Sequence, residues 1–325
     1  MRKTISILLS IVLVITCFSV AAVATSEDYT DVSPVKWYAP YVNVVTDKGL
    51  MSGMTSSTFD PAGKVTRAQV VQTLYALAGK PVVTADGQFS DLTAKWYQDS
   101  VNWAGALGVA SGYADGSFKP NNQVKRQEIA TFFKAYAEKI EKKDTSAVAD
   151  LSGYSDYSKV SNYAKTPVAW AVRSGLMDSA VSGKKVLDPQ GLVTRAQLAT
   201  ILCGYIGEKP APAPTEIGSG KMYLVNESGT TEDMDAIIIY AKEDLVLTQI
   251  GLEAWDFDGS KISFIYVDDV LNEKEQLGNT QTSITLTGNM LKVGTHVVKV
   301  LQYDNNDPSG KIVTVKSAKY TIVRM

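Results

Sequence analysis

Apolar residues recur at helical spacing in three stretches of the first two thirds of the chain. In each stretch, large aliphatic or aromatic side chains follow one another at intervals of three and four residues, which is typical of a helix with one buried face. These residues are Val70, Val71, Leu74 and Leu77, then Ile129, Phe132, Phe133 and Tyr136, then Leu198, Ile201, Leu202 and Ile206. The pattern predicts three helices that contribute to a core.

Another helix is expected before each of these. In the middle copy, Val101, Trp103, Ala104 and Leu107 follow a helical period that ends at Gly108. A helix pair of this size leaves its apolar face exposed unless neighbouring pairs cover it. Three pairs should therefore pack around one another as a pseudo-threefold three-helix bundle with lobes, which makes this part of the chain mainly α.

One short motif marks the start of the second helix in every pair. It reads Val65–Gln69, Val124–Glu128 and Val193–Gln197. Each copy follows an aspartate, an aromatic residue, a glycine, and a proline six residues before the arginine: Asp31, Trp37, Gly49 and Pro61; Asp91, Trp96, Gly108 and Pro120; Asp156, Tyr163, Gly175 and Pro189. A period of about 50 to 70 residues indicates a repeat array, with units at 25–80, 81–141 and 142–208.

The pattern changes after a proline-alternating segment, Lys209–Pro214, which favours an extended spacer over residues 209–218. Short β-rich runs divided by turn residues follow it. They are Ile237–Tyr240, Ile262–Val267, Ser283–Leu286, His296–Tyr303, Ile312–Val315 and Tyr320–Val323. About 110 residues with this spacing predict an all-β domain over 219–325, an antiparallel sandwich of immunoglobulin-like type.

The first residues predict export. Arg2 and Lys3 precede an apolar run that ends near the small residues Ala22-Val23-Ala24, which is typical of a signal peptide over 1–24. Cys17 follows Thr16 rather than a small residue, which disfavours lipidation. After cleavage only Cys203 remains, so no internal disulfide can form. Its helical apolar context favours a buried structural residue, and no other run is long enough to cross a membrane.

Charge separates the two halves. The net charge of −2 consists of +2 over residues 25–215 and −6 over residues 216–325, once the two basic residues of the signal segment are set aside. Neither half has the clustered Lys and Arg of a nucleic-acid-binding protein. The sequence therefore predicts a secreted modular protein without a nucleic-acid partner.

The repeated motif contains a capping signal and an unexplained cation. Thr66 with Gln69, and Thr194 with Gln197, fit a capping box, whereas Lys125 cannot cap in this way. An arginine at the first helical position opposes the helix dipole, at a cost of roughly 0.3–1 kcal/mol when exposed. Two explanations remain open: an ion pair with Asp31, Asp91 or Asp156, or an anion site made of helix-start amides and the guanidinium.

These motifs resemble the surface-layer homology (SLH) family of bacterial cell-surface proteins. The resemblance covers residues 29–207 and rests on three copies in register of the Asp-to-aromatic opening, the Gly-Leu-Met-Ser-Gly type of turn and the Thr-Arg-Ala-Gln helix start. It implies a single spindle around a central three-helix bundle. It also implies grooves between units that bind pyruvylated secondary cell-wall polysaccharide linked to peptidoglycan, and hence a location at the cell wall or in a surface layer.

The resemblance also suggests roles for individual residues. The groove arginines that meet the acidic sugar ketal would be Arg67, Arg126 and Arg195, with Asp31 and Asp91 nearby. Trp37, Trp96 and Tyr163 would face a sugar ring, with core packing as the alternative, whereas Trp103 and Trp170 are expected in the core. Gly53 and Gly112 would let a backbone amide approach the ligand. The third unit departs most, with Ser179 in place of the second glycine, so its groove is expected to be altered or unused.

Candidates for catalysis are few. His296, the single histidine, lies in an alternating strand pattern, and no serine or cysteine stands in a nucleophile motif. The acidic pairs Asp256/Asp258 and Asp268/Asp269 lack the ligand loop of a dedicated calcium motif and are expected to be solvated turn residues. The sequence thus predicts no enzyme activity, no metal and no cofactor.

Three functions therefore remain from the sequence. The preferred one is a wall-binding protein that displays the β domain. The second is a self-assembling surface-layer subunit whose β domain makes lattice contacts with other copies or another protein. The third is a wall hydrolase anchored by its repeats, which the missing catalytic residues disfavour.

Overall fold

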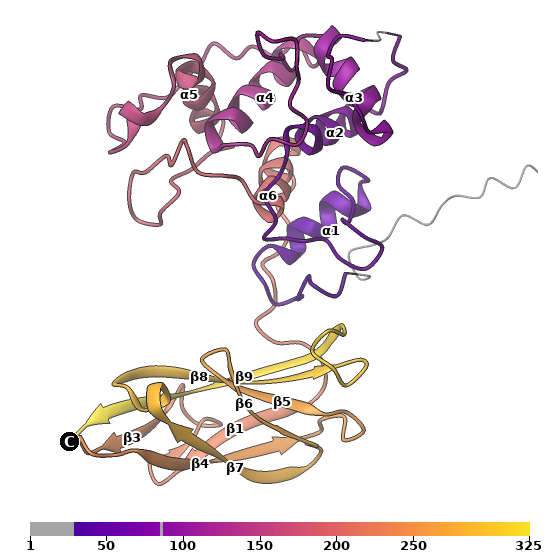
Figure 1. Cartoon of the computed structure of the whole chain (residues 1–325). Coiled ribbons are helices and arrows are strands. Elements are labelled where there is room, and N and C mark those ends of the chain that lie inside the picture. The colour runs from indigo at the N-terminus through magenta and orange to yellow at the C-terminus, as the bar shows by residue number, and fades with distance from the viewer. Residues whose placement is uncertain (1–28, 85–86) are drawn as a thin grey trace, which may run out of the picture.

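A computed structural model describes residues 29–84 and 87–325 of the chain. The expected signal peptide and Cys17 lie outside the described residues. Figure 1 shows a helical part above and a β-sheet part below, joined by a single extended segment. Their buried apolar side chains form two separate clusters, so each part has a core of its own.

The helical part contains the three expected helix pairs. They are α1 (Ala39–Asp47) with α2 (Arg67–Leu77), α3 (Lys95–Ala106) with α4 (Arg126–Lys139), and α5 (Lys165–Arg173) with α6 (Arg195–Ile206). Two short 3₁₀ turns, Tyr157–Lys159 and Asn162–Ala164, precede α5. The pairs exchange partners, because α3 packs on α2, α5 on α4 and α1 on α6 (Figure 1). The first helix of each unit thus covers the second helix of the preceding unit.

Main-chain hydrogen bonds close the three units into a ring. Val65 N–H donates to Val193 O, Val193 N–H to Val124 O, and Val124 N–H to Val65 O, each at 3.0 Å. Because each valine also has its side chain buried, the motif fixes both the core and the cyclic order of the units. A pseudo-threefold arrangement follows from this ring.

The expected caps and core positions are confirmed. Thr66 Oγ1 accepts from Gln69 N and Gln69 Oε1 from Thr66 N, and Thr194 pairs with Gln197 in the same way. Lys125 makes no side-chain cap, although Glu128 Oε2 still accepts from Lys125 N at 2.8 Å. Trp103 and Trp170 are buried, as predicted.

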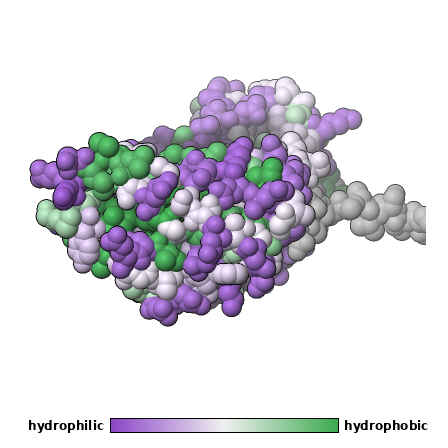
Figure 2. All heavy atoms as spheres, turned by 90° about the horizontal axis from the view of Figure 1, so that it is seen from below, coloured by the Kyte–Doolittle hydropathy of each residue, from purple (hydrophilic) through white to green (hydrophobic). Residues whose placement is uncertain are grey.

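The β part is a sandwich of two sheets. Its strands are β1 (Lys221–Asn226), β2 (Gly229–Thr230), β3 (Ile237–Ala241), β4 (Leu247–Trp255), β5 (Ser263–Val267), β6 (Val270–Glu275), β7 (Thr280–Thr287), β8 (Gly294–Tyr303) and β9 (Ile312–Arg324). One sheet has the order β2-β1-β4-β7 and the other β3-β9-β8-β5-β6. Figure 2 views the molecule from below, where hydrophilic and intermediate side chains cover much of the β part and hydrophobic ones gather toward one end.

Two details of the sandwich differ from the sequence prediction. The purely antiparallel expectation is wrong at one edge, because β3 pairs with β9 in parallel. The two runs expected at Ile312–Val315 and Tyr320–Val323 form one strand, β9. Strands β1, β4 and β6 were not among the runs expected from the sequence. Charged and amide residues in them interrupt the apolar pattern.

Removal of one cap tests the contribution of the motif to stability. We expect Thr66→Ala to lower the free energy of unfolding of the helical part by about 1 kcal/mol, because Gln69 N loses its acceptor. Urea unfolding followed by far-UV circular dichroism measures it. Lys125→Ala is the matched control and should change stability by less than about 0.5 kcal/mol, since no side-chain cap is lost. Equal losses in the two variants would contradict the capping explanation.

Candidate functional site

The three motif arginines reach from one unit into the next. Arg195 donates through Nε to Phe59 O and through Nη2 to Ser52 O, both at 2.6 Å. Arg67 and Arg126 make the equivalent pairs of bonds, Arg67 to Phe118 O and Ser111 O and Arg126 to Leu187 O and Asp178 O. Each guanidinium therefore binds the loop of the following unit, whereas each motif valine amide donates to the preceding unit.

The expected ion pair between these arginines and the repeat aspartates is wrong. No salt bridge involves an arginine anywhere in residues 29–84 and 87–325. The aspartates instead accept main-chain bonds. Asp31 holds Phe59 N and Asp60 N, Asp91 holds Phe118 N and Lys119 N, and Asp156 holds Leu187 N and Asp188 N. Each aspartate thus holds in place the loop whose main-chain carbonyl groups accept the hydrogen bonds of the arginine.

The helix-start amides are also occupied, which corrects the expected anion site. Arg195 N donates to Gly63 O and Ala196 N to Pro61 O, while Gln197 N is capped by Thr194 Oγ1. The first-turn amides of α2 and α4 are similarly bound to the next unit's loop. A ligand in these grooves therefore meets the guanidinium, not the helix amides.

Burial leaves each guanidinium charged but poorly solvated. Arg195 is 5% exposed and Arg67 8% exposed. Burial lowers the pKa of Arg195, with a partial offset from Asp60, Tyr29 and Asp31. Its Cζ lies 4.4 Å from the centre of the Phe59 ring, and its Nη1 has no hydrogen-bond partner among the described residues. Carbonyl dipoles and a ring face compensate the charge only in part, so an anion at Nη1 would be stabilised.

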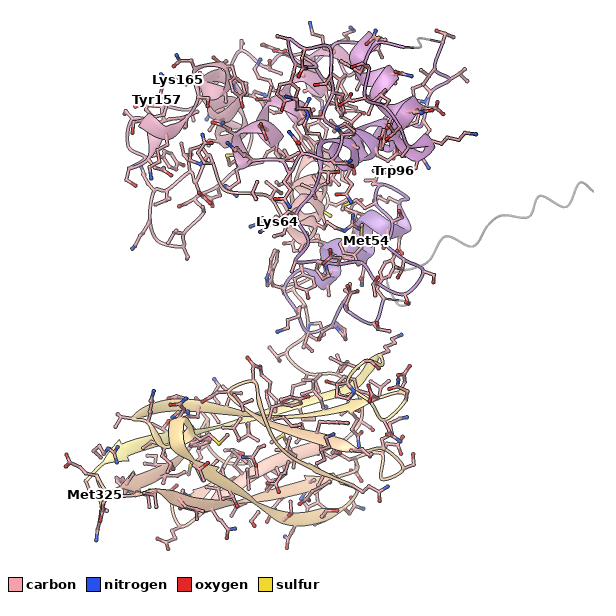
Figure 3. The ribbon with its side chains drawn as sticks, viewed as in Figure 1. Met54, Lys64, Trp96, Tyr157, Lys165 and Met325 are labelled. Carbon is pink, nitrogen blue, oxygen red and sulfur yellow. The ribbon has the colours of Figure 1, made fainter. Side chains whose placement is uncertain are left out.

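Arg195 lines the wider of two described grooves that contain a motif arginine. This groove, of about 610 Å³, combines the turn 49–54 and helix α2 of the first unit with Trp96 of the second unit and Arg195 of the third. Figure 3 labels two of its lining residues, Met54 of the first unit and Trp96 of the second. Lys80 adds a second cation, and the lining includes no carboxylate. We call it the Arg195 groove.

A smaller groove of about 180 Å³, the Arg126 groove, has the same plan. It takes the turn 176–179 and helix α6 from the third unit, Trp37 from the first and Arg126 from the second. Asp178 stands in its lining, and Ser179 Oγ is bonded within its own loop to Val181 O and Val186 O. The irregular third unit thus alters the groove of Arg126, whereas the sequence had placed this alteration at the third unit's own arginine.

The third position of the ring surrounds Arg67 with aromatic and acidic groups. Its Cζ lies 4.6 Å from the Phe118 ring centre, 5.2 Å from Tyr113 and 5.3 Å from Phe132. Burial lowers its pKa, and Tyr113, Glu128, Tyr163 and Asp91 oppose that shift. Glu128 replaces the glutamines at positions 69 and 197. This environment is therefore less favourable for an added anion than the Arg195 groove.

The three unit-start aromatics lie at the surface and not in the core. Trp37 is 57% exposed, Trp96 54% and Tyr163 57%. Gly53 and Gly112 differ from their expected role. Gly53 N already donates to Tyr29 Oη at 2.7 Å, and a Cβ on Gly112 would lie 2.5 Å from the Phe89 ring. These glycines make room for the aromatic residue two positions before each repeat aspartate.

A model of the S-layer homology domain matches residues 28–71, 88–130 and 153–199. These three segments contain every helix start and turn that builds the grooves. The three repeats of this chain are S-layer homology domains. Domains of this family anchor proteins to the cell wall, and the chain is a cell-surface protein. No helix in the described ranges is long and apolar enough to span a bilayer.

Several curated proteins are similar to this S-layer homology chain. An endoglucanase of Bacillus sp. (strain KSM-635) is 25% identical over 253 residues, which are 70% of this chain and 26% of that protein. The Surface-layer 125 kDa protein of Lysinibacillus sphaericus is 27% identical over 186 residues, 56% of this chain and 15% of its own. The cellulosome-anchoring protein of Acetivibrio thermocellus is 28% identical over 109 residues, 32% and 24% of the two chains. The chain spans about a quarter or less of these relatives.

Among solved structures, fibronectin(III)-like modules of Clostridium thermocellum CbhA align with 27% of this chain and 90% of theirs, at 16% identity and a TM-score of 0.19. This score is too low to add to the description of the β sandwich given above.

Outside the grooves, the remaining candidates are structural. Burial raises the pKa of the Cys203 thiol to about 11, as expected of an inert buried cysteine. His296 Nδ1 lies 2.5 Å from Asp268 Oδ2 and Nε2 lies 2.7 Å from Lys292 O, so both ring nitrogens are engaged. Asp258 accepts from Ser260, and Asp269 pairs with Lys299. No group of three potential metal ligands occurs in the described part of the chain.

The cyclic sharing of each groove was not visible in the sequence. The resemblance implied grooves between units, but it did not indicate which arginine and which aromatic residue share one. The structure places Arg195 with Trp96 and Arg126 with Trp37. Lys80 and Met54 were missed, and their only sequence signal is their position just outside the turn and the helix that the motifs mark.

The corrected role of Gly53 predicts a loss of stability. A Cβ at this position would lie 2.5 Å from the Tyr29 ring and 2.7 Å from Thr58 O. Gly53→Ala should therefore lower the free energy of unfolding by about 1–3 kcal/mol. Gly204→Ala is the matched control, because Gly204 lies in α6 with nothing within 4 Å of its Cβ position. It should raise stability by about 0.5–1 kcal/mol. Thermal and urea unfolding measure both, and a neutral Gly53→Ala would refute the packing role.

Proposed function

We propose that the repeats anchor the chain to the cell wall by binding pyruvylated secondary cell-wall polysaccharide, mainly in the Arg195 groove. The observation that carries this proposal is the unpartnered Nη1 of Arg195 in a groove lined by Trp96 and Lys80. A ketal carboxylate would meet a desolvated guanidinium that lacks a counter-ion. Charge-assisted hydrogen bonds of this kind are about twice as strong as neutral ones.

The sugar ring has a complementary surface beside the charge. Trp96 presents an exposed indole across the groove from the turn 49–54, so an apolar sugar face can cover it. Gln69 and Gln72 of α2 supply amide groups to the same groove for sugar hydroxyls. Gln69 also contributes to its capping box, so the side chain is held in place. The cations, the indole face and the side-chain amides of this groove together suit an acidic saccharide.

The three ring positions differ in charge, and this sets their order within the proposal. The Arg195 groove has Arg195 and Lys80, the Arg126 groove has Arg126 opposed by Asp178, and Glu128 stands near Arg67. A carboxylate near a guanidinium lowers the positive potential that the guanidinium offers to a ligand. The Arg195 groove is therefore favoured, because its lining contains two cations and no carboxylate.

The surface-layer and cellulosome-anchoring relatives support attachment to the cell surface as the purpose of the repeats. The same proposal holds that the chain binds and does not catalyse, with the β domain displayed outward. The engaged nitrogens of His296 and the buried thiol of Cys203 support this view. The endoglucanase similarity does not oppose it, because the chain spans only 26% of that enzyme.

Substitutions on the Arg195 groove test the proposal with purified pyruvylated wall polymer. Trp96→Ala and Arg195→Lys should each weaken binding about tenfold, a loss of about 1.4 kcal/mol. The first removes the ring face, and the second keeps the charge but loses the planar fork. Calorimetry with the purified protein measures the affinities.

Matched controls separate binding from folding. Tyr163→Ala removes an aromatic ring of similar exposure and should reduce affinity much less. Removal of the pyruvyl groups from the polymer should abolish the difference between wild type and Arg195→Lys. Full binding by Trp96→Ala, or unchanged binding of the depyruvylated polymer, would contradict the groove assignment.

A further inference from the structure

The outer face of the four-stranded sheet carries an unusual set of side chains where β1 meets β4. Trp255 lies directly opposite Lys221, and Tyr223 lies opposite Glu253, which in turn lies opposite Gln281 of β7. Their neighbours in sequence, Met222, Leu224, Leu252 and Ala254, are buried in the core of the sandwich. The alternation of a strand therefore turns all five side chains to the same solvent-facing side. We call them the Trp255 platform.

Two aromatic residues on this face are diagonal neighbours. Trp255 is 39% exposed, and no aromatic or cation–π contact engages it within residues 29–84 and 87–325. Diagonal cross-strand neighbours lie about 7–8 Å apart, so the two rings follow one another along the face. The polar groups between them are partly ordered, since Gln281 Nε2 donates to Glu253 Oε1 at 3.1 Å.

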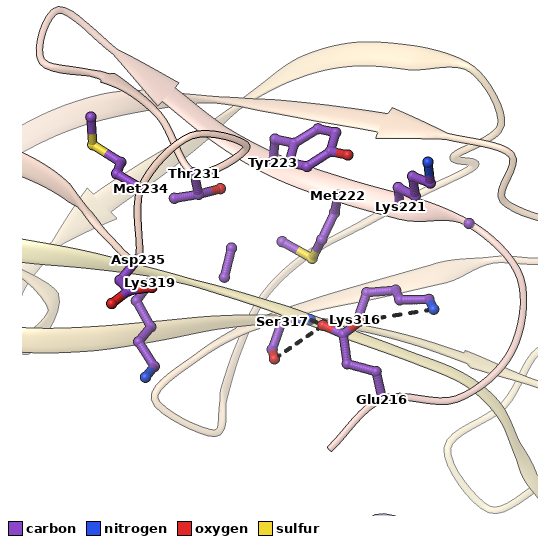
Figure 4. A pocket seen from close by; sticks show the side chains of 12 residues that line it. Glu216, Lys221, Met222, Tyr223, Thr231, Met234, Asp235, Lys316, Ser317 and Lys319 are labelled. Carbon is purple, nitrogen blue, oxygen red and sulfur yellow. Dashed lines mark hydrogen bonds and ion pairs between the residues drawn. The ribbon is translucent and has the colours of Figure 1, made fainter. Parts of the chain in front are cut away.

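A crevice continues the platform on the other side of β1. It has a volume of about 560 Å³ and lies between β1 and β9 (Figure 4), with Tyr223 and Lys221 in its lining as well. The side chain of Met222 points into it, and Thr231 and Ser317 stand at its sides. The crevice thus extends the Trp255 platform past the edge of β1, with the apolar Met222 inside it and polar side chains at its sides.

The crevice also offers main-chain groups. Leu224 uses its outward N–H and C=O on Thr231 Oγ1 and Thr231 N. Met222, two residues earlier, turns its own N–H and C=O to the same side. On this side of β1, the paired strand β2 reaches only Val225 and Asn226, so it does not bond to either group. They are available to hydroxyl groups of a ligand.

From this arrangement we infer that the Trp255 platform and its crevice bind an extended β-1,4-linked glycan. Pyranose rings in such a chain present C–H faces to aromatic rings and hydroxyl groups to the edges, which matches rings flanked by Lys, Glu and Gln side chains. A β-1,4-linked chain is ribbon-like and fits a sheet face, whereas α-linked glucans coil away from it. The inference is independent of the anchoring grooves.

Affinity electrophoresis of the full chain in gels that contain hydroxyethylcellulose tests the inference, with pullulan as the α-linked comparison. We expect hydroxyethylcellulose to retard the protein and pullulan to have no effect. Trp255→Ala should weaken the retardation about tenfold, as for a residue that dominates an interface. Trp255→Phe should keep most of it, since an aromatic face remains.

Two controls locate the effect. Tyr240→Ala removes another exposed strand aromatic, 59% exposed and on the other sheet, and should bind as the wild type does. Arg195→Lys impairs the proposed anchoring groove and should also retain hydroxyethylcellulose binding. Absence of retardation, equal retardation by pullulan, or full retardation of Trp255→Ala would overturn the inference. Loss of retardation in Arg195→Lys would assign the glucan to the groove and overturn it as well.

Discussion

The cyclic set of bonds between units is the constraint on which the helical part depends. Each motif donates a valine amide to the preceding unit in the ring. It donates two helix-start amides and two N–H groups of one guanidinium to the next unit. A single repeat has none of these acceptors and leaves an apolar helix face uncovered. Three copies satisfy one another, which is why the unit is written three times and why the helices pack on partners from neighbouring units.

The same bonds account for the chemistry of the grooves. Burial of a guanidinium without a carboxylate partner has a large desolvation penalty. Here the main-chain carbonyl groups of the neighbouring loop offset part of that penalty. The aspartates that could have neutralised the arginines are used to hold those loops. Because the aspartates are used in this way, one nitrogen of the guanidinium remains available to a ligand in the groove. The surrounding charges then decide how much of that positive potential is available: Lys80 adds to it, while Asp178 and Glu128 reduce it.

The β domain follows a different logic. Its hydrophobic core is separate from that of the repeats. The edge of β1 beside the crevice stays open because β2 is only two residues long and pairs with the far end of β1. Trp255 and Tyr223 lie on the one face that borders this opening, which gives the domain a surface suited to a sugar chain.

The sequence by itself determined the repeat number, the helix starts, the buried stripes and the change to β structure after the proline segment. These depend on local chemistry: apolar spacing, capping side chains and turn residues act within a few positions of one another. The caps at Thr66 and Thr194, and the core places of Trp103 and Trp170, were predictable for this reason. Strands β1, β4 and β6 were not predictable from the sequence, since the exposure of their side chains depends on which strands lie beside them.

Only the tertiary structure decided which residues share a groove. Arg195 shares a groove with Trp96 and the turn 49–54 because the ring brings residues of all three units together, and no spacing along the chain encodes that arrangement. The role of Asp31 and Asp91 was decided in the same way. Their carboxylates accept hydrogen bonds from main-chain amides of a folded loop and not from the arginines, and no sequence motif marks those amides. Local signals therefore fix the elements, while closure of the ring fixes the site.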